Sequence, residues 1–263
     1  CRAARYSLLG GGKRIRAVLV LSVCEMLGGN MAAAEQFAAA VEMLHCYSLI
    51  HDDLPALDND EYRRGRRTTH IVYGEAMAIL AGDALLNYAY ETAVRAFEIE
   101  PGNPAIGKVL QILTKKTGIY GMLGGQCVDV EAAGREISRE KLDFIYRLKT
   151  SALIEASMMV GAALAGASEA EIKVIEDSAR DIGLAFQIRD DILDVTSTQE
   201  VLGKPVLSDE KNDKTTYVTI EGIEKAKSDV EEISKRAVSA LQSLDRKNDF
   251  LEELVLMLVN RKK

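Results

Sequence analysis

The sequence contains no tryptophan, only four prolines and few aromatic residues, which make up 5% of the chain. β-Sandwiches draw on aromatic and β-branched residues, whereas the Ala, Leu, Glu and Lys that are abundant here are strong helix formers. With 263 residues, of which 48% are hydrophobic, the chain is long enough to bury one large core. We therefore predict an all-α fold and a single domain over residues 1–263.

Paired metal-binding cysteines are also lacking, because no C-x-x-C spacing joins the four cysteines, which are Cys1, Cys24, Cys46 and Cys127. The absence of this spacing argues against a zinc site and a disulfide scaffold, and it favours a reducing, cytoplasmic location. The chain begins at Cys1 rather than at a methionine, so we expect an upstream segment to be missing.

Long uncharged apolar runs are absent as well. Glu75 and Asp83 interrupt one candidate and Glu155 another, so none reaches the roughly 18 residues of a spanning helix. The formal net charge is −7, whereas nucleic acids and anionic membranes select basic surfaces. We expect no nucleic-acid partner and no stable membrane insertion.

Two clusters of aspartate stand out. The stretch from Leu49 to Asp60 reads L-I-H-D-D-L-P-A-L-D-N-D, and the stretch from Asp190 to Asp194 reads D-D-I-L-D. Carboxylates without counter-charges repel one another and are costly to bury. Two such clusters on one chain predict that a divalent metal and an anionic substrate join them.

The first acidic cluster follows a helix predicted over residues 32–53, because apolar positions recur there at helical spacing and Pro55 favours an end at Leu54. His45 precedes Asp52 by seven residues, which places it two turns away on the same face, roughly 10 Å distant. A packed core histidine is the alternative interpretation of His45.

Basic residues gather in two places. Lys13 and Arg16 share one face at the start of a helix predicted over residues 13–27, where the free N–H groups also favour anions. A solvated helix start explains them equally well. After the first acidic cluster come Arg63, Arg64, Arg66 and Arg67, and guanidinium groups bind phosphate bidentately. We interpret this second group as a diphosphate site rather than as a surface charge run.

The rest of the chain is predicted to be helical between a few loops. We expect one or two helices over residues 71–100, a loop at 100–104, a helix from Ile106 to Gln126, another over 142–167, one over 169–195 and an amphipathic tail over 217–263. The polar segment 196–216 is predicted to be a lid. Lys149 lies in a strongly apolar stretch, which indicates an anionic partner.

Together these motifs resemble the trans-prenyl diphosphate synthases, in particular the bacterial short-chain farnesyl type. The resemblance covers essentially the whole chain and rests on G-G-K-R-I-R at residues 11–16, D-D-L-P-A-L-D at 52–58, R-R-G at 63–65, G-G-Q at 124–126, K-T at 149–150, F-Q-I-R-D-D-I-L-D at 186–194, G-K at 203–204 and K-T-T-Y at 214–217. It implies the isoprenoid synthase fold, in which helices surround a deep cavity, and a homodimer. Ala17, Arg189 and Leu207 depart from the usual family pattern.

The resemblance also assigns roles to residues. It implies about three Mg²⁺ ions bound with the substrate diphosphate. The metal-binding positions would be Asp52, Asp53, Asp58, Asp190, Asp191 and Asp194, with Asp52, Asp58, Asp190 and Lys149 as the catalytic set. The allylic diphosphate would contact Arg63, Lys149, Thr150, Gln187 and Lys204. Isopentenyl diphosphate would contact Lys13, Arg16, His45 and Arg64.

Product length is expected to depend on Tyr47 and Ser48, which lie about one turn before Asp52. In the family this pair resembles farnesyl synthases, and geranylgeranyl diphosphate synthase is the near alternative. A terpene cyclase is less consistent with the second cluster and with the basic residues. A non-catalytic subunit would typically have lost one acidic cluster.

Overall fold

Helices account for nearly all of the regular structure in the computed structural model, which describes residues 2–196 and 215–259. The helices are α1 (Arg2–Leu8), α2 (Ile15–Leu27), α3 (Met31–Asp52), α4 (Thr69–Tyr73), α5 (Glu75–Ala93), α6 (Ala96–Ile99), α7 (Ala105–Thr117), α8 (Met122–Ala132), α9 (Arg139–Ile145), the π-helix η1 (Tyr146–Ser151), α10 (Ala152–Leu164), α11 (Glu169–Thr196), α14 (Tyr217–Glu221), α15 (Ile223–Gln242) and α16 (Asp249–Val259). The predicted all-α class is confirmed.

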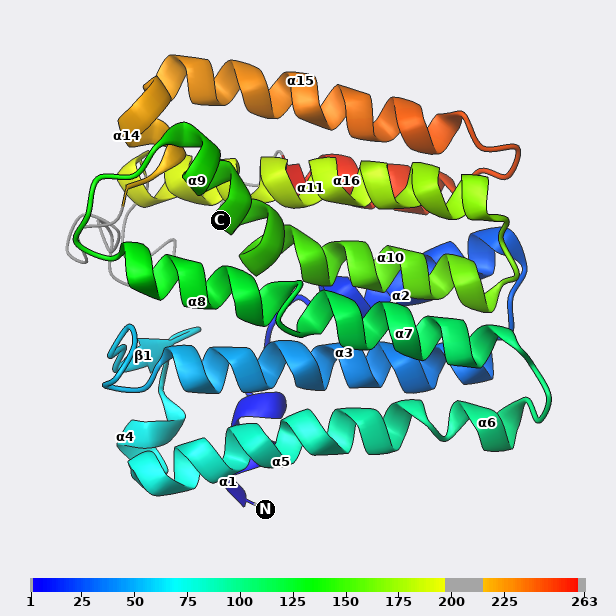
Figure 1. Ribbon diagram of the computed structural model, residues 1–263, viewed down its shortest axis with the longest axis horizontal. Coiled ribbons are helices and arrows are strands. Elements are labelled where there is room, and N and C mark those ends of the chain that lie inside the picture. Colours follow the sequence, from blue (N-terminus) through cyan, green and yellow to red (C-terminus); the bar gives the residue numbers. More distant parts are fainter. Residues whose placement is uncertain (1, 197–214, 260–263) are drawn as a thin grey trace.

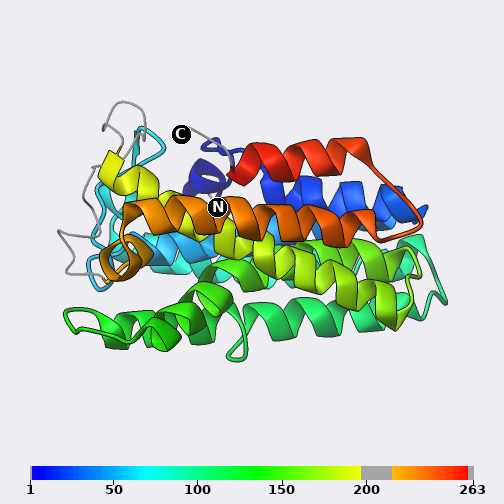
Figure 2. The same cartoon turned by 90° about the horizontal axis from the view of Figure 1, so that it is seen from above.

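The long helices run side by side along the longest axis of the molecule (Figures 1 and 2). In Figure 1, α5 forms the lower edge, α15 forms the upper edge, and α3, α10 and α11 lie between them. Contacts join α3 to α2 and α5, α10 to α2, α7 and α11, and α11 to α15. All residues of α10 except Met159 are buried, so this helix is the centre of the bundle.

Helix α3 has well-defined ends, which fix the position of the first acidic cluster. At its start, the side chain of Asn30 accepts hydrogen bonds from the backbone N–H groups of Ala32 and Ala33. At its end, the backbone N–H of Leu54 donates to the carbonyl of His51, and Pro55 follows. The predicted end of this helix therefore lies within two residues of the observed one.

Two helices predicted as continuous are interrupted. The helix expected from Ile106 to Gln126 breaks between Thr117 and Met122, because Gly118 is extended there and Gly121 has other non-helical backbone angles. Gln126 consequently lies inside α8 and not at a helix end. Within residues 142–167, the chain passes through α9, η1 and α10, and a π-helical turn was not predicted.

A small hairpin follows the first acidic cluster, where the sequence indicated only a basic run. Strands β1 (Tyr62–Arg63) and β2 (Arg66–Arg67) pair antiparallel. The intervening Arg64 and Gly65 have φ values of 54° and 73°, as a type I′ turn requires. The hairpin holds Arg63 and Arg64 at defined positions beside the end of α3.

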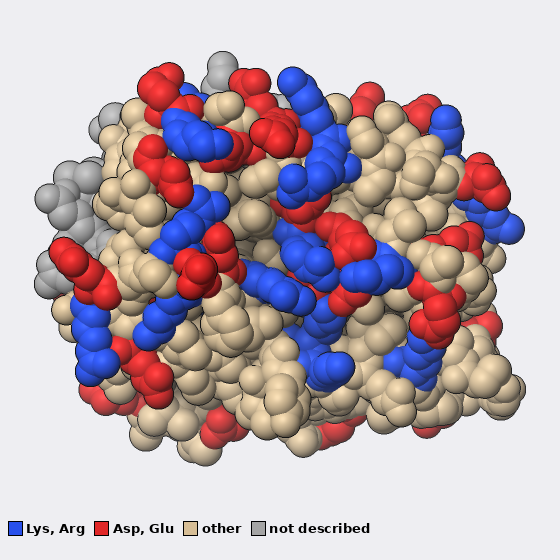
Figure 3. Space-filling model, turned by 45° about the horizontal axis from the view of Figure 1, so that its top comes forward, with Lys and Arg blue, Asp and Glu red and all other residues tan. Residues whose placement is uncertain are grey.

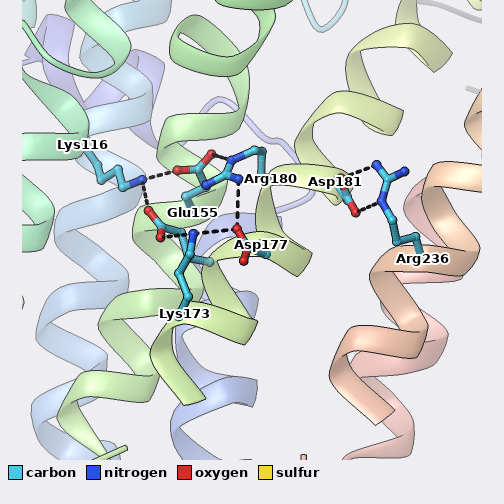
Figure 4. A network of polar contacts seen from close by, with 8 residues as sticks. Lys116, Glu155, Lys173, Asp177, Arg180, Asp181 and Arg236 are labelled. Carbon is cyan, nitrogen blue, oxygen red and sulfur yellow. Dashed lines mark hydrogen bonds and ion pairs between the residues drawn. The ribbon is translucent and has the colours of Figure 1, made fainter. Parts of the chain in front are cut away.

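A buried ionic network joins α7, α10 and α11 (Figure 4). Glu155 is 2% exposed and pairs with Lys116, which also contacts Glu176 at 2.8 Å. The Nε atom of Arg180 lies 3.7 Å from Glu155. Because a buried charge is costly without a counter-charge, this network holds the three helices in one arrangement.

We expect Lys116→Met to destabilise the fold by about 3 kcal/mol, because Glu155 then loses its closest counter-charge while remaining buried. Arg236→Met removes the ion pair to Asp181 at 2.6 Å, in which Arg236 is largely exposed, and is expected to cost at most about 1 kcal/mol. Urea unfolding of the two variants checks this difference. Equal losses would contradict the importance of the buried network.

Among the described helices, none combines the length and the apolar character that a membrane crossing requires.

Candidate active site

Both acidic clusters lie at the same end of the bundle. Helix α3 reaches this end at Asp52, and α11 reaches it with Asp190 and Asp194 in its last two turns (Figure 1). After α3 the chain turns back on itself, and the backbone N–H of Asp58 donates to the carbonyl of Asp52 at 2.9 Å. The turn thereby brings two aspartates of the first cluster together, as the spacing predicted.

A cavity of about 260 Å³ opens beside the end of α3. Its walls come from α2, α3, the turn after α3, α8, η1 and α10, and they are Arg16, His45, Tyr47, Ser48, Leu49, His51, Asp52, Leu57, Met122, Leu123, Gln126, Lys149, Thr150 and Leu153. Residues from four separate motifs of the sequence therefore meet in one space that is basic on one side, acidic at one edge and apolar elsewhere.

The basic side of the cavity is suited to an anion. The Nε atom of Arg16 is buried and has no hydrogen-bond partner among the described residues. Burial lowers the pKa of Arg16 to about 10, although Glu42 opposes this effect. At that value Arg16 remains charged at neutral pH, so an anionic group is the natural partner for its guanidinium.

His45 faces the same side. Burial, reinforced by the neighbouring positive charges of Arg16, Arg64, Arg63 and Arg14, holds the pKa of His45 well below its usual range. The imidazole is therefore neutral near pH 7 and can donate one hydrogen bond and accept another.

Not every basic residue predicted for the acceptor diphosphate lines this cavity. Lys13 is exposed just before α2. Arg64 lies at the tip of the hairpin, where its Nη1 donates to the carbonyl of Gly11 at 2.5 Å, and it lines a smaller neighbouring pocket. Arg16 and His45 are thus brought together, and Lys13 and Arg64 lie beside them.

Arg63 is bound to the first acidic cluster. Its Nε donates to Oδ1 of Asp53 at 2.7 Å, and Asp60 lies 3.6 Å from its Nη2. Asp53 is 4% exposed, and burial raises the pKa of its carboxyl group to about 6, with Arg63 opposing this shift. Asp53 therefore positions a guanidinium in this structure, and its metal binding stays a prediction.

On the opposite wall, the π-helix contributes two polar side chains. The Nζ of Lys149 contacts Oδ2 of Asp129 at 2.6 Å, and the hydroxyl of Thr150 donates to Oε1 of Gln187 at 2.8 Å. Asp129 is thus the anionic neighbour that the apolar surroundings of Lys149 indicated. Lys204 lies outside the described residues, as does most of the predicted lid.

The three aspartates of the second cluster have different environments. Asp190 is partly exposed, and its charge acts on Arg16, whereas Asp191 and Asp194 are buried. Asp191 accepts hydrogen bonds from Gln187, Tyr146 and the backbone of Tyr217. The three aspartates predicted together as metal-binding positions therefore comprise one accessible carboxylate and two buried ones.

The donor set fits Mg²⁺. Within residues 2–196 and 215–259, no three His, Cys, Asp or Glu side chains converge closely enough to hold a metal ion by themselves. Mg²⁺ binds oxygen ligands, keeps several waters and commonly uses one or two carboxylates completed by substrate phosphates. Asp52 lines the cavity, and Asp58 and Asp190 lie at the same end of the bundle, so these three carboxylates would hold the metal together with a diphosphate.

Gln126 and Tyr146 are functional candidates to which the sequence reasoning assigned no role. The Nε2 of Gln126 donates to Oδ1 of Asp52 at 2.7 Å and thereby fixes the carboxylate. Gln126 was recognisable as a polar residue beside two glycines, but its partner lies 74 positions away. Tyr146 carried no signal in the sequence, because its hydroxyl partner is set by the packing of η1 on α11.

Tyr47 and Ser48 lie in the wall of the cavity below Asp52. Tyr47 is 7% exposed, and its ring makes an edge contact with His51 at 5.8 Å between centroids. The small side chain of Ser48 also lines the cavity, and its hydroxyl donates to the carbonyl of His45 at 2.9 Å. Of these two residues, the tyrosine supplies the bulk.

A helical bundle with two aspartate clusters at one end, the first of which borders a cavity, agrees with the fold that the resemblance implied. Residues 1–254 match the family model described as polyprenyl synthetase, and the chain belongs to this family. The resemblance predicted from the motifs is thereby confirmed.

Curated relatives include synthases of two product lengths. The chain is 46% identical to the chloroplastic geranylgeranyl pyrophosphate synthase of Capsicum annuum, over 92% of this chain and 66% of the relative. It is 45% identical to the geranylgeranyl diphosphate synthase of Cyanophora paradoxa, over 98% and 86%. It is 44% identical to the farnesyl diphosphate synthase of Geobacillus stearothermophilus, over 86% and 76%. The chain thus spans about two thirds of the plant relative.

Solved structures share the fold closely. The geranyltransferase of Helicobacter pylori, complexed with magnesium and isoprenyl diphosphate, superposes with a TM-score of 0.87 at 34% identity, over 98% of this chain and 86% of the other. An FPP/GFPP synthase from Zymomonas mobilis gives a TM-score of 0.87 at 33% identity, over 98% and 87%.

Proposed function

We propose that this protein is a Mg²⁺-dependent prenyltransferase that condenses isopentenyl diphosphate with dimethylallyl or geranyl diphosphate to give farnesyl diphosphate and diphosphate. The observation that carries the proposal is the single cavity in which Arg16 and His45 lie on one side and Asp52, Gln126 and Lys149 on the other. Such a cavity can hold two anionic substrates with their hydrocarbon parts facing each other.

Each wall has its own task in this reaction. Arg16 and His45 bind the diphosphate of the acceptor and hold its double bond toward the donor. Lys149 and Thr150, with Arg63 from the hairpin beside the cavity, bind the donor diphosphate and stabilise the charge that accumulates on it as the allylic C–O bond breaks. When bound, Mg²⁺ supplies further positive charge to that leaving group.

The remaining steps need no side-chain nucleophile. The acceptor double bond attacks the allylic carbon, a C–C bond forms, and a proton leaves the acceptor, for which the released diphosphate is the nearby base. The apolar wall formed by Met122, Leu123 and Leu153 keeps water from the carbocation.

Tyr47 supports a fifteen-carbon product, because its buried ring forms the wall of the cavity about one turn below Asp52. Geranylgeranyl diphosphate synthase is the second candidate, and the identity to relatives with that name supports it.

The direct test is incubation with isopentenyl diphosphate, Mg²⁺ and either dimethylallyl or geranyl diphosphate, followed by chromatography of the dephosphorylated products. We expect diphosphate release, farnesol as the main alcohol, and loss of turnover when a chelator removes the metal. Absence of diphosphate release with every allylic primer would refute the proposed activity, and geranylgeraniol as the main alcohol would favour the second candidate.

We also propose that two copies associate through α5. Its outer face exposes Met77, Leu80 and Tyr88, with Leu80 58% exposed, and contiguous apolar surfaces of this kind mark interfaces. Sedimentation equilibrium is expected to give twice the chain mass.

A cytoplasmic location remains our proposal from cysteine usage, although some relatives are chloroplastic.

A further inference from the structure

The π-helix η1 is a local departure from regular helix that lies between two cavities. Lys149 and Thr150 line the candidate active site, whereas Arg147 and Leu148 line a separate cavity of about 420 Å³. The face on which α10 and α11 come forward is hollowed near its middle, with Lys and Arg side chains around the hollow (Figure 3). A regular helix advances 100° per residue, so the wider π turn alters which residues reach each side.

Two glycines allow the neighbouring helices to pack closely against this turn. A Cβ atom on Gly125 of α8 would lie 2.3 Å from the backbone nitrogen of Lys149. A Cβ atom on Gly183 of α11 would lie 2.4 Å from Oγ of Ser151. Both neighbouring helices therefore approach η1 to within contact of its backbone, and the position of Lys149 depends on that packing.

Hydrogen bonds fasten the same turn to α11. The hydroxyl of Tyr146 donates to Oδ2 of Asp191 at 2.5 Å, and the backbone N–H of Tyr217 donates to the same oxygen at 2.9 Å. Oδ1 of Asp191 accepts from Gln187 at 3.1 Å, and Gln187 in turn accepts from Thr150. Tyr146 and Thr150, one at each end of the turn, are thus both linked to one buried carboxylate.

We propose that Tyr146 and Asp191 are positioning residues that hold the π-helical turn so that Lys149 and Thr150 face the donor diphosphate. Asp191 is 2% exposed, and its oxygens already accept three hydrogen bonds. A metal ligand needs an accessible oxygen, which Asp190 offers and Asp191 does not. The identity of the bound group rests on the proposed function, but the fastening of the turn does not.

Tyr146→Phe removes one hydroxyl at constant ring volume. We expect about a tenfold weaker affinity for an unreactive allylic diphosphate analogue in the presence of Mg²⁺, measured by calorimetry, which corresponds to about 1.4 kcal/mol. Affinity for isopentenyl diphosphate is expected to change less than twofold. Gly125→Ala is a second variant that displaces the same turn and is expected to give the same selective loss.

Tyr217→Phe is the matched control. It also removes one buried hydroxyl, which donates to Asp229 at 2.6 Å, but it leaves the backbone bond to Asp191 in place. We expect its affinity for the analogue to change less than twofold.

A double-mutant cycle tests whether Tyr146 acts through Lys149. In a Lys149→Ala background, Tyr146→Phe is expected to weaken the affinity for the analogue by a smaller factor than in the parent protein, because coupled residues are not additive. Full additivity, or equal weakening of both substrates, would overturn the proposal.

Hydrogen exchange separates this inference from the proposed function. Amides of residues 146–151 are expected to exchange at least fivefold faster in Tyr146→Phe than in Tyr217→Phe. If exchange is faster in Tyr146→Phe but the unsubstituted protein releases no diphosphate, the proposed activity is wrong. The proposal that Tyr146 holds the turn is still supported by that result. Unchanged exchange would reject the fastening itself.

Discussion

Asp52→Asn is expected to lower kcat by about a thousandfold, the upper range for loss of a preorganised charge at a reacting centre. Asparagine has nearly the shape of aspartate, and its side-chain oxygen can still accept the hydrogen bond from Gln126. The negative charge at the end of α3 is lost. The C-terminus of α3 carries only about half an elementary negative charge, so it does not make up for the lost carboxylate. Initial rates of diphosphate release measure the change.

The control for this variant is Asp245→Asn, which removes an exposed carboxylate in the loop before α16. We expect its kcat to stay within twofold of the parent protein. The half-saturating concentration of Mg²⁺ is a second readout, and it is expected to rise in Asp52→Asn alone. Unaltered kcat and unaltered Mg²⁺ dependence in Asp52→Asn would show that Asp52 does not bind the metal.

Tyr47→Ala is expected to shift the main product from fifteen to twenty carbons. The ring is 7% exposed and contributes to the cavity wall, so its removal opens space continuous with the existing cavity. Chromatography of the product alcohols measures the shift. Thermal unfolding is needed beside it, because truncating a buried aromatic residue costs about 3–5 kcal/mol in a closed core.

The matched control here is Tyr47→Phe, which removes the hydroxyl and retains the ring. Its product length is expected to equal that of the parent protein. If both variants lengthened the product, the hydroxyl rather than the bulk would be responsible. If neither did, the end of the cavity would have to lie elsewhere, for example at Met122 or Leu153.

Much of the fold was accessible from the sequence, because long apolar periodicities and strong end signals determine it. Asn30 and Pro55 bracket α3, and the predicted helix over residues 169–195 agrees with α11 to within one residue. The breaks between helices were harder to predict from the sequence. Gly118 and Gly121 interrupt a periodic pattern without a proline, and glycine within an apolar run is equally compatible with close helix packing.

The contacts of the candidate site are likewise of two kinds, local ones that the sequence predicts and long-range ones that it does not. Clustered residues such as Asp52 and Asp58 are brought together by a short turn, so their proximity follows from local sequence. Contacts such as that between Tyr146 and Asp191 join residues 45 positions apart. They depend on how η1 packs on α11, and a π-helical turn leaves no periodicity by which to recognise it.

Position along helix α3 also corresponds to depth below Asp52. It is one unbroken helix of 22 residues with Asp52 at its tip and Tyr47 in the cavity wall. Each further turn away from Asp52 adds 5.4 Å of depth, close to the length of one extended isoprene unit. If Tyr47 limits the product as we propose, we expect substitutions at successive turns of this helix to change product length in steps while Asp52 stays in place.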